Sequence, residues 1–283
     1  MAQMANIKLV TDSSIQLTPE EIAKYDIHVI PLTIMIDSTV YVDGETITRA
    51  EFMDKMAAAS ALPKTSQPAI GTFLDTFNEL TADGSEVLAV HMLEAISGTV
   101  NSARQAAELC KGKVTVVDSQ FTDRALSFQV IEAAKAIQAG KSMAEVVKRM
   151  AVIRDHTKLV MGVSTLDNLV KGGRISRVSG MLSSLLNIKV ILEVTGGELK
   201  ALQKGRGMKT LVNFADKTVE QMAKLGNVKS VGVSYAGGKK LAEDIGAKVK
   251  AALPNAELLV RPTDPVIATH TGDGAFAITY YVD

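Results

Sequence analysis

Short apolar runs alternate with amphipathic segments along the first 155 residues of the chain. Residues 7–10, 86–91 and 113–117 are apolar runs of strand length, whereas residues 99–109 and 123–139 have the apolar spacing of helices. Short buried strands that alternate with helices are typical of a parallel sheet covered on both faces. The first half of the chain therefore predicts an α/β/α domain.

Several helix starts are marked by a hydroxyl residue followed three positions later by Glu. This spacing allows a capping box, in which each side chain bonds the other residue's backbone N–H. The pairs are Thr18 with Glu21, Thr48 with Glu51, and Ser142 with Glu145. A further helix is expected over residues 69–80, and the apolar run 28–36 precedes a turn at Asp43-Gly44.

The second half of the chain predicts a mixed sheet. Residues 188–194 and 199–202 flank Thr195-Gly196-Gly197 and predict a β-hairpin. Further strands are expected at 158–163, 228–235, 257–261 and 275–282, and helices at 208–224 and 239–252. The sequence thus predicts a two-domain α/β fold, with a parallel-sheet domain over residues 1–157 and a mixed-sheet domain over residues 158–283.

Composition excludes several classes of protein. The 31 Lys and Arg balance the 31 Asp and Glu, which argues against nucleic-acid binding because such proteins need a basic surplus. Apolar residues make up 47% of the chain, enough to form a large core, but aromatics only 4%, so base-stacking surfaces are not expected. Cys110 is the single cysteine, so no intrachain disulfide can form. With no signal peptide, membrane span or metal-ligand spacing in the sequence, we expect a cytoplasmic protein.

Two glycine-containing segments imitate nucleotide-binding motifs but lack required residues. Gly140-Lys141-Ser142 resembles the end of a P-loop, but Lys135 stands where the earlier Gly should be, so a helix end followed by a helix start is favoured. Gly205-Arg206-Gly207 lacks the third Gly of a dinucleotide fingerprint. The chain therefore predicts no nucleotide site.

Polar turns follow several predicted strands. Asp12 and Ser13 end the first apolar run, and Ser97-Gly98-Thr99 stands before a helix that includes Asn101. Such turns gather at the carboxyl ends of parallel strands, where open α/β sheets bind ligands. Gly98 would allow close backbone approach, and a helix N-terminus favours an anion. Simple helix capping explains the same residues, and the pattern alone leaves both interpretations open.

His270, one of four histidines, lies in a segment rich in Thr and Gly, and the pattern favours neither a structural nor a functional role. Arg174 and Arg206 each stand beside Gly, and we expect both to be exposed.

Five short motifs are distributed along nearly the whole chain. They are Thr11-Asp12-Ser13-Ser14, Thr65-Ser66-Gln67-Pro68, Ser97-Gly98-Thr99, Gly172-Gly173-Arg174-Ile175-Ser176 and His270-Thr271-Gly272. In this order and spacing they resemble the DegV family, which includes the fatty-acid-binding subunit of bacterial fatty acid kinase. Two positions depart from the family pattern, because Asp273 and Val190 stand where the family usually or often has Pro.

The resemblance implies a ligand cleft between two domains that buries the tail of a long-chain fatty acid. It places the carboxylate among Thr65, Ser97, His270 and Thr271, and assigns Arg174 and Arg206 to docking of a partner kinase that supplies ATP and Mg²⁺. The further candidate ligand contacts are Asp12, Ser13, Ser66, Gly98 and Asn101. The chain would then be a carrier without a cofactor of its own. Transient contact with a membrane is a further interaction that the resemblance leaves open. Segments 28–36 and 181–186 are candidates for the tunnel wall.

Two other functions stay open from the sequence. His270 could act as a nucleophile, as in the distantly similar dihydroxyacetone kinase and sugar-phosphotransferase subunits, although no base that would activate it is evident. A regulatory module that signals lipid status would use the same cleft. A phosphohistidine or a covalent adduct at His270 would favour the enzyme, and the identity of the partner would separate the carrier from the regulator.

Overall fold

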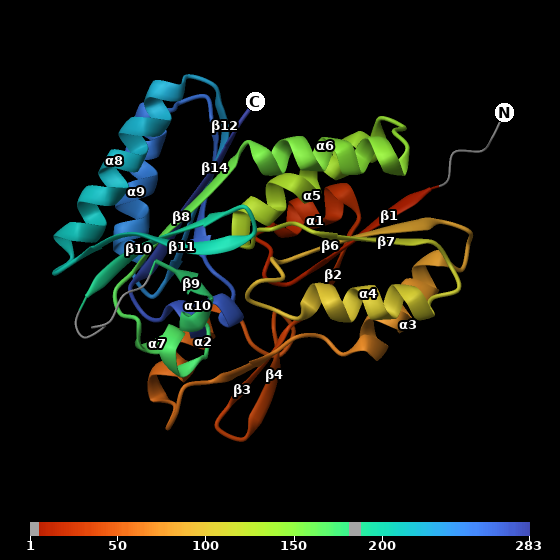
Figure 1. Ribbon diagram of the computed structural model, residues 1–283, viewed down its shortest axis with the longest axis horizontal. Helices are drawn as coiled ribbons and strands as arrows, with labels where there is room; N and C mark the ends of the chain where they lie inside the picture. The colour runs from red at the N-terminus through yellow and green to blue at the C-terminus, as the bar shows by residue number, and fades with distance from the viewer. Residues whose placement is uncertain (1–5, 181–187) are drawn as a thin grey trace.

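The computed structural model describes residues 6–180 and 188–283. Figure 1 shows two α/β lobes side by side, with a small sheet below the region where they meet. The first lobe contains a four-stranded sheet and the second a seven-stranded sheet. The predicted two-domain α/β fold is confirmed. A strand of the second large sheet begins at Thr157, next to the domain boundary predicted from the sequence. The division of the chain into two domains at that boundary stays a prediction.

The sheet of the first lobe is parallel throughout, as predicted. Its strand order is β2-β1-β6-β7. The strands are β1 (Ile7–Asp12), β2 (Ile27–Ile30), β6 (Glu86–His91) and β7 (Val114–Asp118). Their carboxyl ends face the second lobe, so the turns that follow β1, β6 and β7 lie at the junction (Figure 1).

Helices cover both faces of this sheet. Those on one face are α1 (Pro19–Tyr25), α5 (Asp123–Gln138) and α6 (Met143–Asp155), and those on the other are α3 (Ile70–Thr81) and α4 (Thr99–Leu109). Within β6, Leu88 packs in the cluster that contains Leu126 of α5, whereas Ala89 packs in the cluster that contains Phe73 of α3. Successive strand residues point to opposite faces, so a sheet buried on both sides must be apolar at consecutive positions.

The capping boxes predicted from the sequence are present. Thr18, Thr48 and Ser142 each exchange hydrogen bonds with the Glu three residues later, at the starts of α1, α2 (Arg49–Ala58) and α6. Gly140, with φ of +74°, follows the end of α5. The segment that imitates a P-loop therefore joins two helices, as expected.

The sheet of the second lobe is mixed and has the order β13-β12-β14-β8-β10-β11-β9. Its strands are β8 (Thr157–Val163), β9 (Val178–Ser179), β10 (Lys189–Thr195), β11 (Glu198–Gly205), β12 (Val228–Ala236), β13 (Glu257–Pro262) and β14 (Ala275–Val282). The predicted hairpin is formed by β10 and β11, which pair antiparallel. Helices α8 (Lys209–Leu225) and α9 (Lys239–Ala252) cover one face, which leaves the other face to meet the first lobe (Figure 1).

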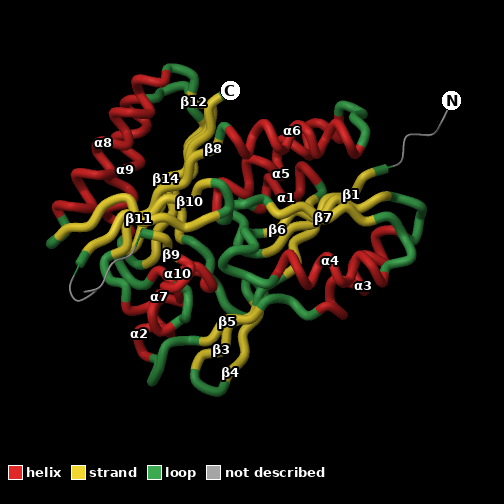
Figure 2. The backbone as a smooth tube through the Cα atoms, viewed as in Figure 1, coloured by secondary structure: helices red, strands yellow, loops and turns green. Residues whose placement is uncertain are grey.

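A third, three-stranded sheet was not predicted. It contains β3 (Thr33–Ile36), β4 (Thr39–Val42) and β5 (Lys64–Ser66) in the order β4-β3-β5, all antiparallel (Figure 2). The apolar run 28–36 is divided between β2 and β3 at Pro31, which has no N–H to donate to a strand partner. Four short elements were also missed: α7 (Asp167–Lys171), the 3₁₀ turn η1 (Ile175–Arg177), the two-residue strand β9 and α10 (Pro265–Thr271).

One apolar cluster lies between the two large sheets. It joins Leu159 and Leu192 of the second sheet to Leu93 and Phe121, which follow strands of the first. Polar contacts add to this junction: Arg49 of α2 donates to the carbonyl oxygens of Ile15, at 3.0 Å, and Pro262, at 3.3 Å. The lobes are thus held together by apolar packing and by hydrogen bonds that satisfy buried backbone carbonyls.

Candidate functional site

A cavity of about 320 Å³ lies between the lobes, at the carboxyl ends of β6 and β7. Its volume falls within the range of ordinary ligand pockets. Most of its wall is apolar, and the lining residues that the structure describes include no Phe, Tyr or Trp. The apolar residues are Leu32, Met92, Leu93, Ile96, Met161, Leu169, Val194, Leu199, Val266 and Ile267.

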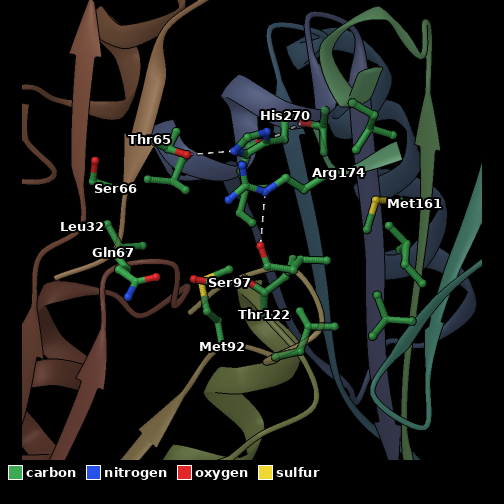
Figure 3. A pocket seen from close by; sticks show the side chains of 18 residues that line it. Leu32, Thr65, Ser66, Gln67, Met92, Ser97, Thr122, Met161, Arg174 and His270 are labelled. Atoms are coloured by element: carbon green, nitrogen blue, oxygen red, sulfur yellow. Dashed lines mark hydrogen bonds between the residues drawn. The ribbon is translucent and has the colours of Figure 1, made fainter. Parts of the chain in front are cut away.

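Polar side chains are concentrated at one side of the cavity (Figure 3). They are Thr65, Ser66, Gln67, Ser97, Arg174 and His270, and two further hydroxyl residues, Thr122 and Thr271, also line the cavity. Thr65 of β5 and His270 of α10 are 205 residues apart in the sequence, yet Thr65 Oγ1 lies 2.9 Å from His270 Nε2. The site therefore contains a polar group made jointly by the small sheet and the second lobe.

His270 is held by a short helix. Asp264 caps α10 by accepting hydrogen bonds from the N–H groups of Val266, at 2.9 Å, and Ile267, at 3.0 Å. The imidazole lies against the backbone at Gly172, where a Cβ atom would stand 2.3 Å from Nδ1. A larger residue at position 172 would displace the ring, so the first part of the Gly172-Gly173-Arg174 motif has a steric role.

Burial lowers the pKa of His270 to about 4, and the nearby charge of Arg174 lowers it in the same direction. The imidazole is therefore neutral at pH 7, with one nitrogen that donates and one that accepts. A neutral ring next to a hydroxyl can orient a ligand by hydrogen bonding without adding charge of its own.

Replacing His270 with Asn is expected to reduce the acid sensitivity of the ligand-free protein. The folded-state pKa lies below the ordinary 6.5, so the unfolded chain binds the proton first and stability falls as the pH drops from 6.5 toward 4. This group accounts for at most about 3 kcal/mol of that loss. Thermal unfolding from pH 7 to 4 would measure it, and equal losses in the variant and the wild type would contradict this assignment.

Arg174 spans the cleft. Its Nε donates to the carbonyl oxygen of Ile96 at 3.3 Å, and Nη1 donates to that of Gly172 at 2.9 Å. Burial lowers the pKa of Arg174, and so does the charge of Arg177. Arg174 was expected to be exposed, but it is half-buried and lines the cavity, because the turn after α7 folds its side chain inward. Arg206, by contrast, is exposed, as expected.

Of the two roles left open for the Ser97-Gly98-Thr99 turn, the structure shows support of a helix start, and ligand contact stays a prediction. Ser97 Oγ lies 2.8 Å from Thr99 Oγ1 and accepts a 3.3 Å hydrogen bond from Thr99 N, so it supports the start of α4. Ser97 also lines the cavity. A Cβ at Gly98 would stand 2.1 Å from Oε1 of Gln67, so the glycine makes room for a lining side chain.

The remaining candidate residues divide between the cavity and other places. Ser66 and Thr271 line it, whereas the wall, as far as the structure describes it, does not include Asp12, Ser13 or Asn101. Asp12 is fully buried, and Ser13 accepts a hydrogen bond from Leu32 N at 3.0 Å. Ligand contact by Asp12, Ser13 and Asn101 stays a prediction without support from the cavity.

Asp12 has a structural environment of its own. Burial alone would raise its pKa, but hydrogen bonds from His91 Nδ1, at 3.1 Å, and Met92 N, at 2.9 Å, lower it below its usual value. The carboxylate thereby joins the ends of β1 and β6. The residue supports the strands that carry the site.

Some lining residues were missed from the sequence. Gln67 stood inside a motif without being singled out, and Thr122 follows β7. The Asp264-Pro265 pair could have predicted α10, since it combines an N-cap residue with Pro at the first helical position. Of the expected tunnel segments, run 28–36 contributes Leu32, and segment 181–186 lies outside the described residues.

Asp273, which stands where the family usually has Pro, contacts residues outside the cavity. Its side chain is exposed and lies against Gly237, where a Cβ would stand 1.6 Å from Oδ1. The carboxylate is not among the described groups that line the cavity.

Two features are absent from residues 6–180 and 188–283. No group of three or more His, Cys, Asp or Glu side chains there is arranged to hold a metal ion. No helix in those ranges has both the length and the apolar character needed to cross a bilayer.

Comparison with known proteins finds relatives over almost the whole chain. A family model described as "Uncharacterised protein, DegV family" matches residues 6–283. A DegV domain-containing protein of Streptococcus pneumoniae serotype 4 is 45% identical over 275 residues, which cover 97% of this chain and 98% of the relative.

The solved structures that are similar to this one include two described by fatty acid binding. The first is DegV from Bacillus subtilis, described as a fatty acid binding protein, with a TM-score of 0.92, 27% identity, and coverage of 99% of this chain and 100% of that one. The second is a DegV family protein from Thermus thermophilus, described by its fatty acid binding, with a TM-score of 0.88, 30% identity, and coverage of 98% and 100%.

Proposed function

Because the chain belongs to the DegV family, we propose that it binds a long-chain fatty acid in the cavity between its lobes. One observation carries this proposal: the cavity of about 320 Å³ has aliphatic walls and polar groups concentrated at one side. A fatty acid has the same division between an alkyl tail and one polar end. The fatty acid binding stated for the Bacillus and Thermus proteins supports the assignment.

The tail supplies most of the affinity. Burying alkyl groups contributes about 0.8 kcal/mol per CH₂, so a long chain gains roughly 10 kcal/mol before the costs of binding. A neutral hydrogen bond contributes only about 1 kcal/mol net. The hydroxyls and the imidazole therefore determine the orientation of the carboxylate more than the strength of binding.

We place the carboxylate beside Thr65, Ser97 and His270, with Ser66 and Thr271 as further hydroxyl residues of the lining. Arg174 would supply the compensating positive charge, because a guanidinium has five N–H donors and can keep its two carbonyl bonds while binding an anion. This assignment moves Arg174 from partner docking to ligand binding. The exposed Arg206 keeps its proposed role in partner docking.

The chain acts in this proposal as a carrier that presents its ligand to a separate ATP-dependent kinase. The support is the motif resemblance to the fatty-acid-binding subunit of fatty acid kinase, together with a sequence that predicts no nucleotide site. A fixed carboxylate suits transfer of a phosphoryl group, because the partner must find one oxygen in a constant place. Since such a kinase requires ATP, we place the protein in the cytoplasm.

Reconstitution would test the carrier role. The chain loaded with oleate or palmitate is expected to yield acyl phosphate when a fatty acid kinase and Mg-ATP are added, and no ATP hydrolysis when the kinase is omitted. The ligand-free chain with the kinase serves as the control. Phosphorylation of His270 by a phosphoryl donor would instead favour the nucleophile hypothesis.

A further inference from the structure

A second, small hollow of about 20 Å³ adjoins the main cavity. The two spaces share four lining residues, Thr122, Met161, Ile267 and Thr271. The hollow is otherwise formed largely by strands β12 and β14 of the second lobe. The shared side chains thus form the partition between the two spaces.

Met161 stands at the sheet side of this partition. It lies on β8, where it is in register with Leu192 of β10 and with Ala277 of β14. Val194, further along β10, lines the main cavity, whereas Ala277 lines the small hollow. Figure 3 shows Met161 across the cavity from Thr65, so it lies away from the polar side where the carboxylate is placed.

The hollow beyond Met161 is lined partly by small residues. Alanines at positions 236, 275 and 277 leave the free space there. The polar residue Asp123 at this end already accepts hydrogen bonds from the hydroxyls of Thr263, at 2.8 Å, and Ser234. Because its carboxylate is satisfied within the protein, the hollow can accept an apolar group without leaving that charge unpaired.

Of the four shared residues, Met161 is the most adaptable. Methionine is unbranched and has several rotatable bonds, so it fills irregular gaps. Ile267 is β-branched and restricted at χ1, and the two threonines are short. The extent to which the partition separates the two spaces therefore depends mainly on the Met161 side chain.

We infer that Met161 sets the longest acyl chain that the protein can bury fully. With Met161 in place, the alkyl tail ends within the main cavity, and removal of the side chain opens the alanine-lined hollow to one or two more methylenes. This inference rests on the proposed binding of fatty acids. It adds a specificity-determining residue to that function.

Affinity for a series of saturated fatty acids, from about twelve to twenty-two carbons, would test the inference. In the wild type, each added methylene is expected to tighten binding about fourfold until the tail reaches Met161, after which the affinity stays level. In M161A the plateau should begin one or two carbons later, which makes the longer acids up to about fifteenfold tighter relative to the wild type. M161V, with a residue suited to strands, provides a second shortened variant if M161A is poorly folded.

Two controls distinguish the effect of opening the partition from the effect of enlarging the main cavity. M92A enlarges the main cavity without touching the partition, so it should leave the plateau closer to the wild-type position than M161A does. Adding A277L to M161A refills the hollow and should restore the wild-type plateau. An unchanged plateau in both M161A and M161V, or an equal shift in M92A, would overturn the inference. Failure of every acid to bind the wild type would contradict the proposed function itself.

Discussion

Replacing Ile267 with Trp is expected to abolish fatty acid binding. Ile267 is a partly buried residue of α10 that lines both the main cavity and the adjoining hollow. An indole there would occupy the space required by the tail, which supplies roughly 10 kcal/mol of gross binding energy. We expect at least a hundredfold loss of affinity for palmitate and oleate, measured by titration with the purified variant.

The matched control is Trp at Val170, an exposed apolar residue of α7. This variant introduces the same side chain outside the wall of the cavity and should bind fatty acid as the wild type does. Circular dichroism and thermal unfolding would establish that both variants are folded. Wild-type affinity in a folded Ile267→Trp variant would show that the ligand does not occupy this cavity.

Replacing Thr65 with Val is expected to have a second large effect, on the rate at which the kinase forms acyl phosphate from the bound ligand. Thr65→Val keeps the shape of the side chain but removes the hydroxyl that lies 2.9 Å from His270 Nε2. Loss of one neutral hydrogen bond should weaken binding by only about fivefold. Misplacement of a reacting group can reduce a rate about a hundredfold, so acyl phosphate formation with the kinase should fall by about ten- to a hundredfold.

The matched control is Thr76→Val on α3, which removes a hydroxyl that donates to the carbonyl oxygen of Thr72. It should change neither affinity nor acyl phosphate formation. Equal losses of binding and turnover in Thr65→Val would indicate that Thr65 contributes affinity alone. That outcome would contradict the proposed division between tail and polar side.

The regular elements could be predicted because their signals are local. The capping boxes at Thr18, Thr48 and Ser142 mark helix starts through residues three positions apart, and apolar runs mark the buried strands. The small sheet escaped prediction because β3 and β5 are separated by the helix α2 and β5 has only three residues. Pro31 was a local sign that the apolar run 28–36 is divided, but it did not show that β2 and β3 belong to different sheets.

The site could be predicted only through the resemblance. Thr65 and His270 lie in different parts of the sequence, and neither residue's neighbours indicate that the other is 2.9 Å away. Asp12 and Ser97 both belong to segments that the sequence predicts as polar turns after strands. Asp12 is instead the last residue of β1 and is fully buried, whereas Ser97 lines the cavity. A polar turn looks the same in both situations, since the difference depends on how the second lobe packs against the first.

Native mass spectrometry followed by lipid extraction would show directly whether the chain carries a long-chain fatty acid. We expect the purified protein to hold one fatty acid per chain, which is released on denaturation. Recovery of empty protein that also fails to bind added oleate or palmitate would contradict the proposed binding.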